Sequence, residues 1–355
     1  MRTSLPAAVF VATLVLATCA LSQTAAAPAW SNPATWGEVH PVETDNIVFA
    51  NVPLIPNPAA AADPGTPAGI RTPIPNTGAP GTMDLHMDIY QVPSTKPTPV
   101  VVQFHGGGWI RGDRPSSSRS FDPFFAAGMS VVTVEYRNAK DAPAPAAIQD
   151  VRCALAWVKR NAAKYNFDVN RIVTYGGSAG GHLALMAAYA PASFNPPGCT
   201  DQPKVAAVLD FYGASNVAEA LTEHGSSGFT HQWLAIDKPL PAEAPAADAT
   251  TSTPSRPPAP RWPEPSPAEL ALAKEVSPMT YIHPGLPPTF IVNGDSDHTF
   301  EPTQSSQLKK ALDAAGVPNG QDLVVGGGHG NFSKAENEKA MLLCLQFLKA
   351  QGIIQ

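Results

Sequence analysis

The stretch that decides the fold spans residues 171–189 and reads RIVTYGGSAGGHLALMAAY. Its first part, Arg171–Tyr175, is a short apolar run, which is typical of a strand buried on both faces. A helical pattern follows from Ala179 to Tyr189, and Ser178 stands at the junction with glycines on both sides. Glycines permit a turn so tight that neighbouring backbones touch. The stretch therefore predicts a strand, a sharp turn and a helix, with the serine held at the turn.

The same alternation of strand and helix continues on both sides of this stretch. Other apolar runs predict strands at residues 83–90, 99–104, 130–136, 204–211, 289–293 and 322–325. Helical patterns lie between them at residues 144–163, 303–315 and 334–349. Short strands that alternate with helices form a parallel sheet in which the strand-helix-strand connections are right-handed. We therefore expect an α/β fold with a mostly parallel, twisted sheet and helices on both faces.

Three regions depart from this alternation. Residues 1–27 carry one positive charge, an apolar stretch and a run of small residues, which is typical of a secretory signal peptide. A membrane anchor is the alternative, but it needs roughly 20 apolar residues. Residues 28–82 are rich in proline and alanine, and we expect a loosely packed leader with one edge strand at 47–52. The main domain, 83–355, is interrupted at 214–277 by a Pro-rich cap insertion.

Within that insertion, residues 239–267 form a tract of proline, alanine, serine and threonine. Such a tract buries too little apolar surface to offset its ordering entropy, so we expect it to be disordered. The flanking segments 229–236 and 268–276 are expected to form short helices. We expect a secreted or periplasmic protein with no stable membrane insertion.

The charge and cysteine content exclude several classes of partner. The formal net charge is −6, and no cluster of lysine and arginine suits a phosphate backbone, so we expect no nucleic-acid partner. Cys153 and Cys344 lie in apolar helical patterns and are interpreted as small core residues. With Cys199 they allow at most one disulfide, and the pairing stays open. No spacing predicts a metal site.

Two glycine-rich motifs point to nucleophilic chemistry. Gly-x-Ser-x-Gly between a strand and a helix predicts a nucleophile elbow at Ser178. The second motif, HGGGW at residues 105–109, follows the predicted strand 99–104. Bare glycine amides can face an oxyanion, so Gly106 and Gly107, with the N–H of Ala179, are the predicted donors. A phosphate-binding loop is the alternative, but neither of its usual glycine patterns is present. His105 is interpreted as a brace for this loop.

A nucleophilic serine needs a base, and the base needs an orienting carboxylate. His329 stands in a glycine-rich loop directly after the strand 322–325 and is the predicted base, in preference to His283 and His298. The acid comes from the loop after the strand 289–293, where Asp297 is preferred to Asp295. Asp295 is interpreted as a turn residue that binds loop amides.

These motifs, with Glu135-Tyr136-Arg137, Asp150 and Ser277-Pro278, resemble the esterase branch of the α/β-hydrolase superfamily, which includes hormone-sensitive-lipase-like and bacterial feruloyl or acetylxylan esterase-like proteins. The resemblance covers residues 83–355 and implies an α/β-hydrolase catalytic domain with no metal or organic cofactor. The long Pro-rich insertion and Phe300 depart from the usual pattern, and they bear on substrate preference.

The resemblance implies a serine carboxylesterase that acts on short-chain acyl or aryl esters, as small molecules or on a polymer such as plant polysaccharide. A peptidase on the same fold, a polyester or cutinase-like hydrolase and a non-catalytic binding protein are the alternatives. Trp109 and Tyr212 follow strand ends and are candidates for the substrate pocket, with core packing as the alternative. His182 is interpreted as a packing residue, and Asp150 and Arg152 as members of bracing ion pairs. The sequence predicts no oligomeric state.

Overall fold

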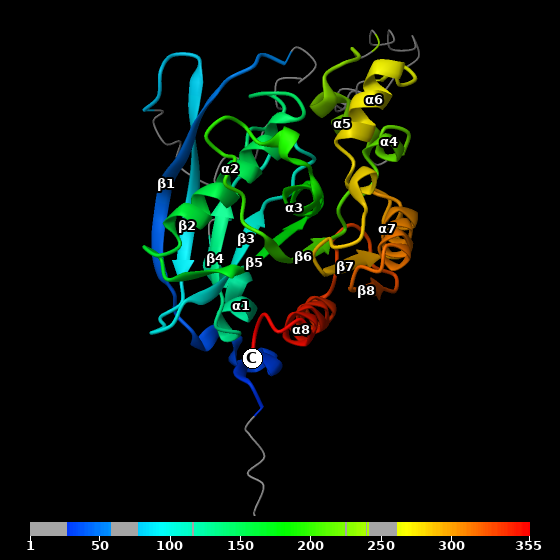
Figure 1. Cartoon of the computed structure of the whole chain (residues 1–355). Coiled ribbons are helices and arrows are strands. Elements are labelled where there is room, and N and C mark those ends of the chain that lie inside the picture. The colour runs from blue at the N-terminus through cyan, green and yellow to red at the C-terminus, as the bar shows by residue number, and fades with distance from the viewer. Residues whose placement is uncertain (1–26, 58–76, 116, 224–225, 239, 241–260) are drawn as a thin grey trace, which may run out of the picture.

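The computed structural model describes residues 27–57, 77–115, 117–223, 226–238, 240 and 261–355. The predicted signal peptide, apart from its last residue, and most of the Pro-rich tract lie outside the described residues. The described chain is built around an eight-stranded sheet with the order β1-β2-β4-β3-β5-β6-β7-β8 (Figure 1).

In the described sheet β2 runs opposite to the other strands, and the rest of the sheet from β4 onward is parallel. β2 pairs antiparallel with both β1 and β4, whereas β4, β3, β5, β6, β7 and β8 are mutually parallel. The strands are β1 (Val42–Pro53), β2 (Thr82–Gln91), β3 (Thr98–Phe104), β4 (Ser130–Val134), β5 (Phe167–Gly177), β6 (Val205–Phe211), β7 (Thr289–Gly294) and β8 (Asn319–Val324). The mostly parallel sheet predicted from the apolar runs is therefore confirmed.

Helices cover both faces of this sheet, as predicted. The helices are α1 (Asp122–Ala126), α2 (Ala146–Asn161), α3 (Ala179–Tyr189), α4 (Val217–Ala220), α5 (Ser227–Leu234), α6 (Pro267–Glu275), α7 (Pro302–Ala314) and α8 (Lys334–Ala350). Side chains of α2, α3 and α7 share one hydrophobic core with one face of the sheet. Those of α1 and α8 form a second core on the other face. Successive side chains of β3 point to opposite faces, so Val101 enters the second core and Val102 the first.

The N-terminal segment is more tightly packed than the sequence predicts. Trp30 and Trp36 lie in two short 3-10 helices, Ala29–Ser31 and Pro33–Glu38, and both indoles are buried in the second core. The Trp30 indole N–H also donates to the main-chain oxygen of Gln355 at 2.9 Å. The expectation of a loose leader is therefore wrong for these residues. Two tryptophans bury enough apolar surface to order a segment whose overall composition is that of a linker.

The inserted region contributes a small group of helices over one end of the sheet. α4, α5 and α6 pack against one another and lie together at the upper right of Figure 1. α5 and α6 match the two short helices predicted on either side of the Pro-rich tract. They are joined by a buried pair, because His231 Nδ1 lies 2.7 Å from Glu269 Oε1. Among the described residues, no helix combines the length and the apolar character required for a transmembrane span.

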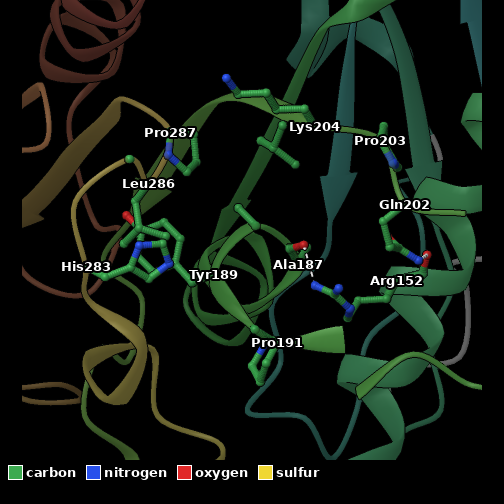
Figure 2. Close-up of a pocket in the computed structure, with 14 residues that line it drawn as sticks. Arg152, Ala187, Tyr189, Pro191, Gln202, Pro203, Lys204, His283, Leu286 and Pro287 are labelled. Atoms are coloured by element: carbon green, nitrogen blue, oxygen red, sulfur yellow. Dashed lines mark hydrogen bonds between the residues drawn. The ribbon is translucent and has the colours of Figure 1, made fainter. Parts of the chain in front are cut away.

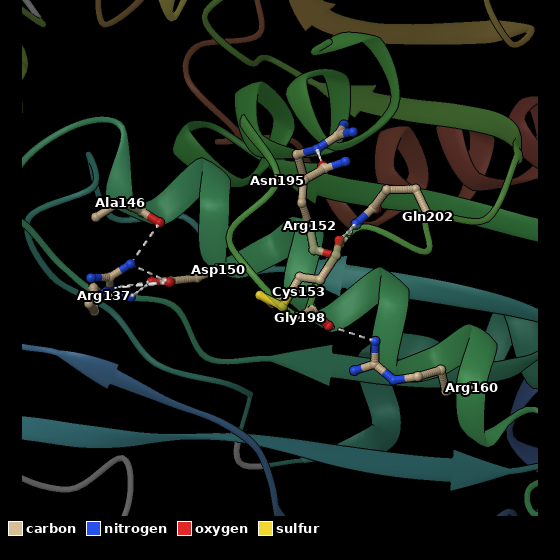
Figure 3. The surroundings of a disulfide bond; sticks show 10 residues. Arg137, Ala146, Asp150, Arg152, Cys153, Arg160, Asn195, Gly198 and Gln202 are labelled. Carbon is tan, nitrogen blue, oxygen red and sulfur yellow. Dashed lines mark hydrogen bonds and ion pairs between the residues drawn. A yellow bond between two sulfur atoms is a disulfide. The ribbon is translucent and has the colours of Figure 1, made fainter. Parts of the chain in front are cut away.

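A disulfide joins α2 to the loop that follows α3. It links Cys153 with Cys199, 46 residues further along the chain (Figure 3). The interpretation of Cys153 as a simple core residue is therefore wrong, since its partner comes from a loop whose position depends on the tertiary fold. Cys344, in contrast, is a buried free thiol, as predicted.

We predict that this disulfide contributes substantially to stability. Replacing both cysteines by alanine (Cys153→Ala with Cys199→Ala) removes a cross-link that restricts the unfolded chain, and we expect the free energy of unfolding to fall by about 2–4 kcal/mol. Urea denaturation of both proteins measures the difference. Reduction with dithiothreitol should destabilise the wild type by a similar amount and leave the double variant unchanged. An unchanged unfolding midpoint in the double variant would contradict the prediction.

Candidate active site

Ser178 occupies a strained turn between β5 and α3. Its backbone has φ 59° and ψ −126°, which is unusual for a residue with a side chain, and its N–H donates to the oxygen of Phe211 at 2.8 Å. The glycines beside it allow a close backbone approach. A Cβ on Gly180 would collide with the carbonyl oxygen of Phe104, and one on Gly176 with the backbone of Gly180. The sharp turn predicted from the glycine pattern is therefore present.

The predicted triad residues meet at the carboxyl ends of three strands. His329 Nε2 lies 2.7 Å from Ser178 Oγ, and His329 Nδ1 lies 2.8 Å from Asp297 Oδ2. The other carboxylate oxygen of Asp297 accepts from the amides of Thr299 at 2.7 Å and Phe300 at 3.2 Å. Because an ionised carboxylate only accepts, Nδ1 carries the proton and Nε2 is left to accept from the serine hydroxyl.

The rejected candidates lie elsewhere. Asp295 Oδ1 accepts from the amide of Gly326 at 2.7 Å, so this residue holds the loop after β8 as a turn residue would. His298 is exposed in the acid loop. His283 lines a separate pocket at the amino ends of the strands. The structure thus brings together Ser178, His329 and Asp297, and none of their rivals.

The HGGGW loop follows β3 and lies against the turn at Ser178. A Cβ on Gly106 would stand 3.5 Å from Ser178 Cβ, and Gly107 follows it in the loop. Ala179 is the first residue of α3, where amide N–H groups have no partner within the helix. The three predicted donors therefore come from the two segments that border the serine.

His105 braces this loop, as predicted. Its ring stacks on Tyr136 at a centroid distance of 4.1 Å, and its Nδ1 lies 2.8 Å from the oxygen of Gly106. Burial lowers the pKa of His105 to about 4, so the ring is neutral and Nδ1 donates to that carbonyl. The Tyr136 hydroxyl donates to the oxygen of His105 at 2.9 Å. In the neighbouring segment, Asp150 holds Arg137 in a buried ion pair at 2.6 Å.

A pocket of about 290 Å³ opens beside Ser178. Tyr212 is one of its lining residues, as predicted, and its ring packs against His329 at 4.9 Å between centroids. Ser178 and Gly106, both predicted site residues, line it too. Further lining residues from β3, β5 and the short 3-10 helix Ser118–Phe121 were not singled out from the sequence. Those residues include Gln103, Ser120, Phe121 and Tyr175.

Trp109 does not line this pocket, so its prediction as a pocket residue is wrong. Its side chain is fully buried, stacks on Trp233 of α5 at 4.5 Å, and donates its indole N–H to His182 Nδ1 at 3.1 Å. His182 Nε2 in turn donates to the oxygen of Val276 at 2.8 Å. Burial lowers the pKa of His182 to about 4, and the neutral ring can both accept and donate. His182 is thus a satisfied packing residue, as predicted.

A buried carboxyl beneath the elbow was missed in the sequence. Asp210, at the end of β6, is 1% exposed and accepts from the amide of Gly213 at 3.0 Å. Within the described structure its second oxygen has no hydrogen-bond partner. Burial raises the pKa of Asp210 to about 7. Its unusual position, an aspartate inside an apolar run, is the one sequence signal that could have pointed to it.

Among the described residues, no cluster of three or more histidine, cysteine, aspartate or glutamate side chains is arranged to hold a metal ion. The chemistry that the site offers is that of a serine, an imidazole and a carboxylate in series, next to backbone amides.

Known proteins share this architecture. The BD-FAE family model matches residues 87–312. The chain is 27% identical to the esterase LipQ of Mycobacterium tuberculosis over 321 residues, which cover 86% of this chain and 66% of LipQ. It is 39% identical to the carboxylesterase NlhH of the same species over 127 residues, or 34% of this chain and 39% of NlhH. The chain thus spans slightly less than two thirds of LipQ and a smaller part of NlhH.

Solved structures agree with these sequence similarities. Esterase Est2 of Thermogutta terrifontis with propionate bound superposes with a TM-score of 0.57 at 25% identity, covering 77% of this chain and 91% of Est2. A truncated carbohydrate esterase from gut microbiota gives a TM-score of 0.61 at 21% identity and covers 89% of this chain and 98% of that one, which is a likeness of fold. Together with the sheet order, these similarities show the α/β-hydrolase fold.

The buried Asp210 leads to a prediction about pH. The pKa of Asp210 is about 7 in the folded protein and about 3.8 in the unfolded chain. Between about pH 4 and pH 7 the folded protein therefore keeps a proton on this carboxyl that the unfolded chain has lost. This carboxyl therefore makes stability fall as the pH rises from about 4 to above 7. Asp210→Asn keeps an acceptor for Gly213 without a charge. We expect the variant to match the wild type near pH 4 and to exceed its free energy of unfolding by about 2–4 kcal/mol at pH 8.

Urea denaturation at both pH values measures this effect. Asp45→Asn, which changes an exposed aspartate on β1, is the matched control. Its free energy of unfolding should change between the two pH values by the same amount as in the wild type. Equal stability of the wild type and Asp210→Asn at pH 8 would show that Asp210 ionises without cost.

Proposed function

Because the chain belongs to the BD-FAE family, within the α/β-hydrolase fold, we propose that it is a serine hydrolase of carboxylic esters. One observation carries the proposal: Ser178, His329 and Asp297 form a continuous chain of hydrogen bonds of 2.7 and 2.8 Å at the mouth of a pocket. Similarity to proteins named esterase and carboxylesterase supports the same reaction.

In the proposed mechanism His329 takes the proton of Ser178 as Oγ attacks the ester carbonyl. Asp297 holds the imidazole with Nδ1 protonated and stabilises the imidazolium that forms. The tetrahedral intermediate then expels the alcohol, which receives the proton from Nε2. Water enters, loses its proton to His329, attacks the acyl-enzyme and releases the carboxylic acid. Ser178 recovers its proton and the cycle closes.

The charge that develops on the carbonyl oxygen needs preorganised donors. Gly106, Gly107 and Ala179 are proposed to supply them through their amide N–H groups. The N-terminus of α3, which begins at Ala179, adds a favourable dipole at the same point. Losing one such donor typically costs about a hundredfold or more in rate.

The proposed location is outside the cytoplasm. The N-terminal segment has the composition of a signal peptide, and the Cys153–Cys199 disulfide supports an oxidising compartment, where such bonds form and persist. We therefore propose a secreted or periplasmic enzyme.

The size of the pocket limits the group that it accepts. A volume of about 290 Å³ suits a short acyl chain or a single aromatic ring. Est2 of T. terrifontis, 25–26% identical to this chain, has been solved with propionate and with butyrate bound, which supports a short acyl group. We propose short-chain acyl or aryl esters as the substrate class. An ester carried by plant polysaccharide meets the same description, and the pocket itself does not select it.

The pocket also favours a substrate that offers hydrogen bonds. Gln103 is 8% exposed, and in the described part of the chain its side-chain oxygen is buried without a hydrogen-bond partner. Tyr175 and Ser120 line the same pocket and add hydroxyl groups. A buried polar atom left unpaired is costly, and a donor on the substrate would remove that cost. The proposed substrate therefore carries a hydroxyl or similar group on the part that enters this pocket.

The first prediction from this proposal concerns the nucleophile. Ser178→Ala should lower hydrolysis of a short-chain nitrophenyl ester by at least about 10⁴-fold, because the attacking oxygen is gone. A fluorophosphonate probe should label the wild type at Ser178, as read by mass spectrometry, and should not label the variant. Ser306→Ala, an exposed position on α7, is the matched control and should behave as wild type. Activity near wild type in Ser178→Ala would overturn the proposal, and absence of labelling in an intact wild type would favour a binding protein.

A second prediction concerns the polar pocket. Gln103→Leu keeps the side-chain volume but removes the unpaired acceptor. We expect the wild type to prefer a hydroxybutyrate ester to the matching butyrate ester, and the variant to lose this preference by about tenfold in the ratio of kcat/KM. Gln307→Leu, on the exposed face of α7, serves as the control. An unchanged ratio in Gln103→Leu would show that this side chain does not meet the substrate.

A further inference from the structure

Figure 2 shows a second pocket, which has a volume of about 300 Å³. It lies at the opposite edge of the sheet from Ser178. It is bordered by the end of α3, the start of β6 and the loop that leads into β7. These are the amino ends of the parallel strands, whereas the proposed catalytic residues follow their carboxyl ends. The pocket is therefore separate from the catalytic pocket, and the proposed hydrolysis does not use it.

Arg152 of α2 forms one wall of this pocket. It is 6% exposed, its Nε donates to Asn195 Oδ1, and its Nη1 donates to the oxygen of Ala187 at 3.0 Å. Burial lowers the pKa of Arg152 to about 10. In the described part of the chain no carboxylate lies within ion-pair distance of this guanidinium. The prediction that Arg152 takes part in a bracing ion pair is therefore wrong.

Among the described residues, the lack of an acidic partner sets Arg152 apart from the other two buried arginines. Arg114 pairs with Asp88, and Arg137 is held by Asp150 at 2.6 Å. Figure 3 shows Arg137, from the loop before α2, against the carboxylate of Asp150, and Arg152 of α2 against the side-chain amide of Asn195. A buried charge without a counter-ion is costly. The carbonyl of Ala187 lies in the last turn of α3, and the partial negative charge at that end of the helix offsets part of the cost of burying Arg152. Nη2 of Arg152 still has no carboxylate partner in the part of the chain that the structure describes.

The remainder of the pocket is also positive or neutral. Figure 2 shows His283 on another side of the pocket and Lys204 at its upper edge, where the lysine side chain runs away from Arg152. No aspartate or glutamate is among the described residues that line it. Gln202 lines it too, and its side-chain amide is held by the oxygens of Arg152 and Cys199. One held cation, Arg152, and an exposed lysine at the rim of one small concave surface attract an anion.

We propose that this pocket binds a compact oxyanion, a carboxylate or a phosphate, at Arg152, with Lys204 at the rim. The guanidinium supplies charge-assisted N–H donors from within the protein, and the ammonium of Lys204 adds a charge at the rim. The bound anion acts as the counter-ion that the fold does not provide for Arg152. This inference does not depend on the proposed esterase reaction.

Isothermal titration calorimetry with inorganic phosphate and with butyrate, at constant ionic strength set by sodium chloride, tests the proposal. We expect one of the two anions to bind, and the tighter one identifies whether phosphoryl or carboxylate chemistry is preferred. Lys204→Gln should weaken binding about tenfold, and Arg152→Gln should weaken it further. Lys310→Gln, an exposed lysine on α7, makes the same change in net charge away from the pocket and should bind as wild type.

Folding and catalysis are checked separately. Arg152→Gln removes bonds to Ala187 and Asn195, so its circular dichroism and unfolding midpoint are recorded first. If it does not fold, Lys204→Gln at the exposed rim decides the question alone. Ester hydrolysis should stay at the wild-type level in Lys204→Gln, because the residue lies at the far edge of the sheet. Failure of both anions to bind the wild type, or equal binding by Lys204→Gln and Lys310→Gln, would overturn the proposal.

Discussion

The close approach of α3 to the end of β3 is the constraint on which the site depends. Gly180 lies so near the carbonyl of Phe104 that a side chain there is sterically excluded. The residue after Phe104 is His105, which opens the HGGGW loop, so the contact that sharpens the turn at Ser178 also sets the loop amides beside it. The backbone bears the strain of φ 59° at Ser178, and the surrounding packed strands hold that conformation.

A neutral histidine connects this turn to the inserted helices. His182 on α3 accepts from Trp109 of the loop and donates to Val276 at the end of α6, while Trp109 stacks on Trp233 of α5. These roles require one ring nitrogen to accept and the other to donate, which only the neutral imidazole can do. Burial favours the neutral form, so the hydrogen bonds and the hydrophobic core reinforce each other. The inserted helices are thereby fastened to the helix that begins at Ser178.

The features predicted correctly from the sequence are those with a local signal. Apolar runs predict strands 99–104 and 289–293, and the positions of Ser178, Asp297 and His329 after such runs predict that these side chains meet at one edge of the sheet. The errors concern contacts between distant residues. The Cys153–Cys199 bond, the burial of Trp30 and the core position of Trp109 depend on partners far away in the chain. Gln103 looks like an ordinary strand residue until the segment 118–121 closes a pocket over it.

The two ends of α3 show how one buried helix organises separate electrostatic environments. Its amino end, at Ala179, presents N–H groups that have no partner within the helix, and a partial positive charge, next to Ser178, where a negative charge would develop during ester hydrolysis. Its other end presents carbonyls, and Arg152 binds one of them at Ala187. Because most of the helix is buried, water screens neither end well. The low dielectric would therefore strengthen the stabilisation of an oxyanion at one edge of the sheet. At the other edge, the same low dielectric raises the free-energy cost of burying Arg152 without a bound anion.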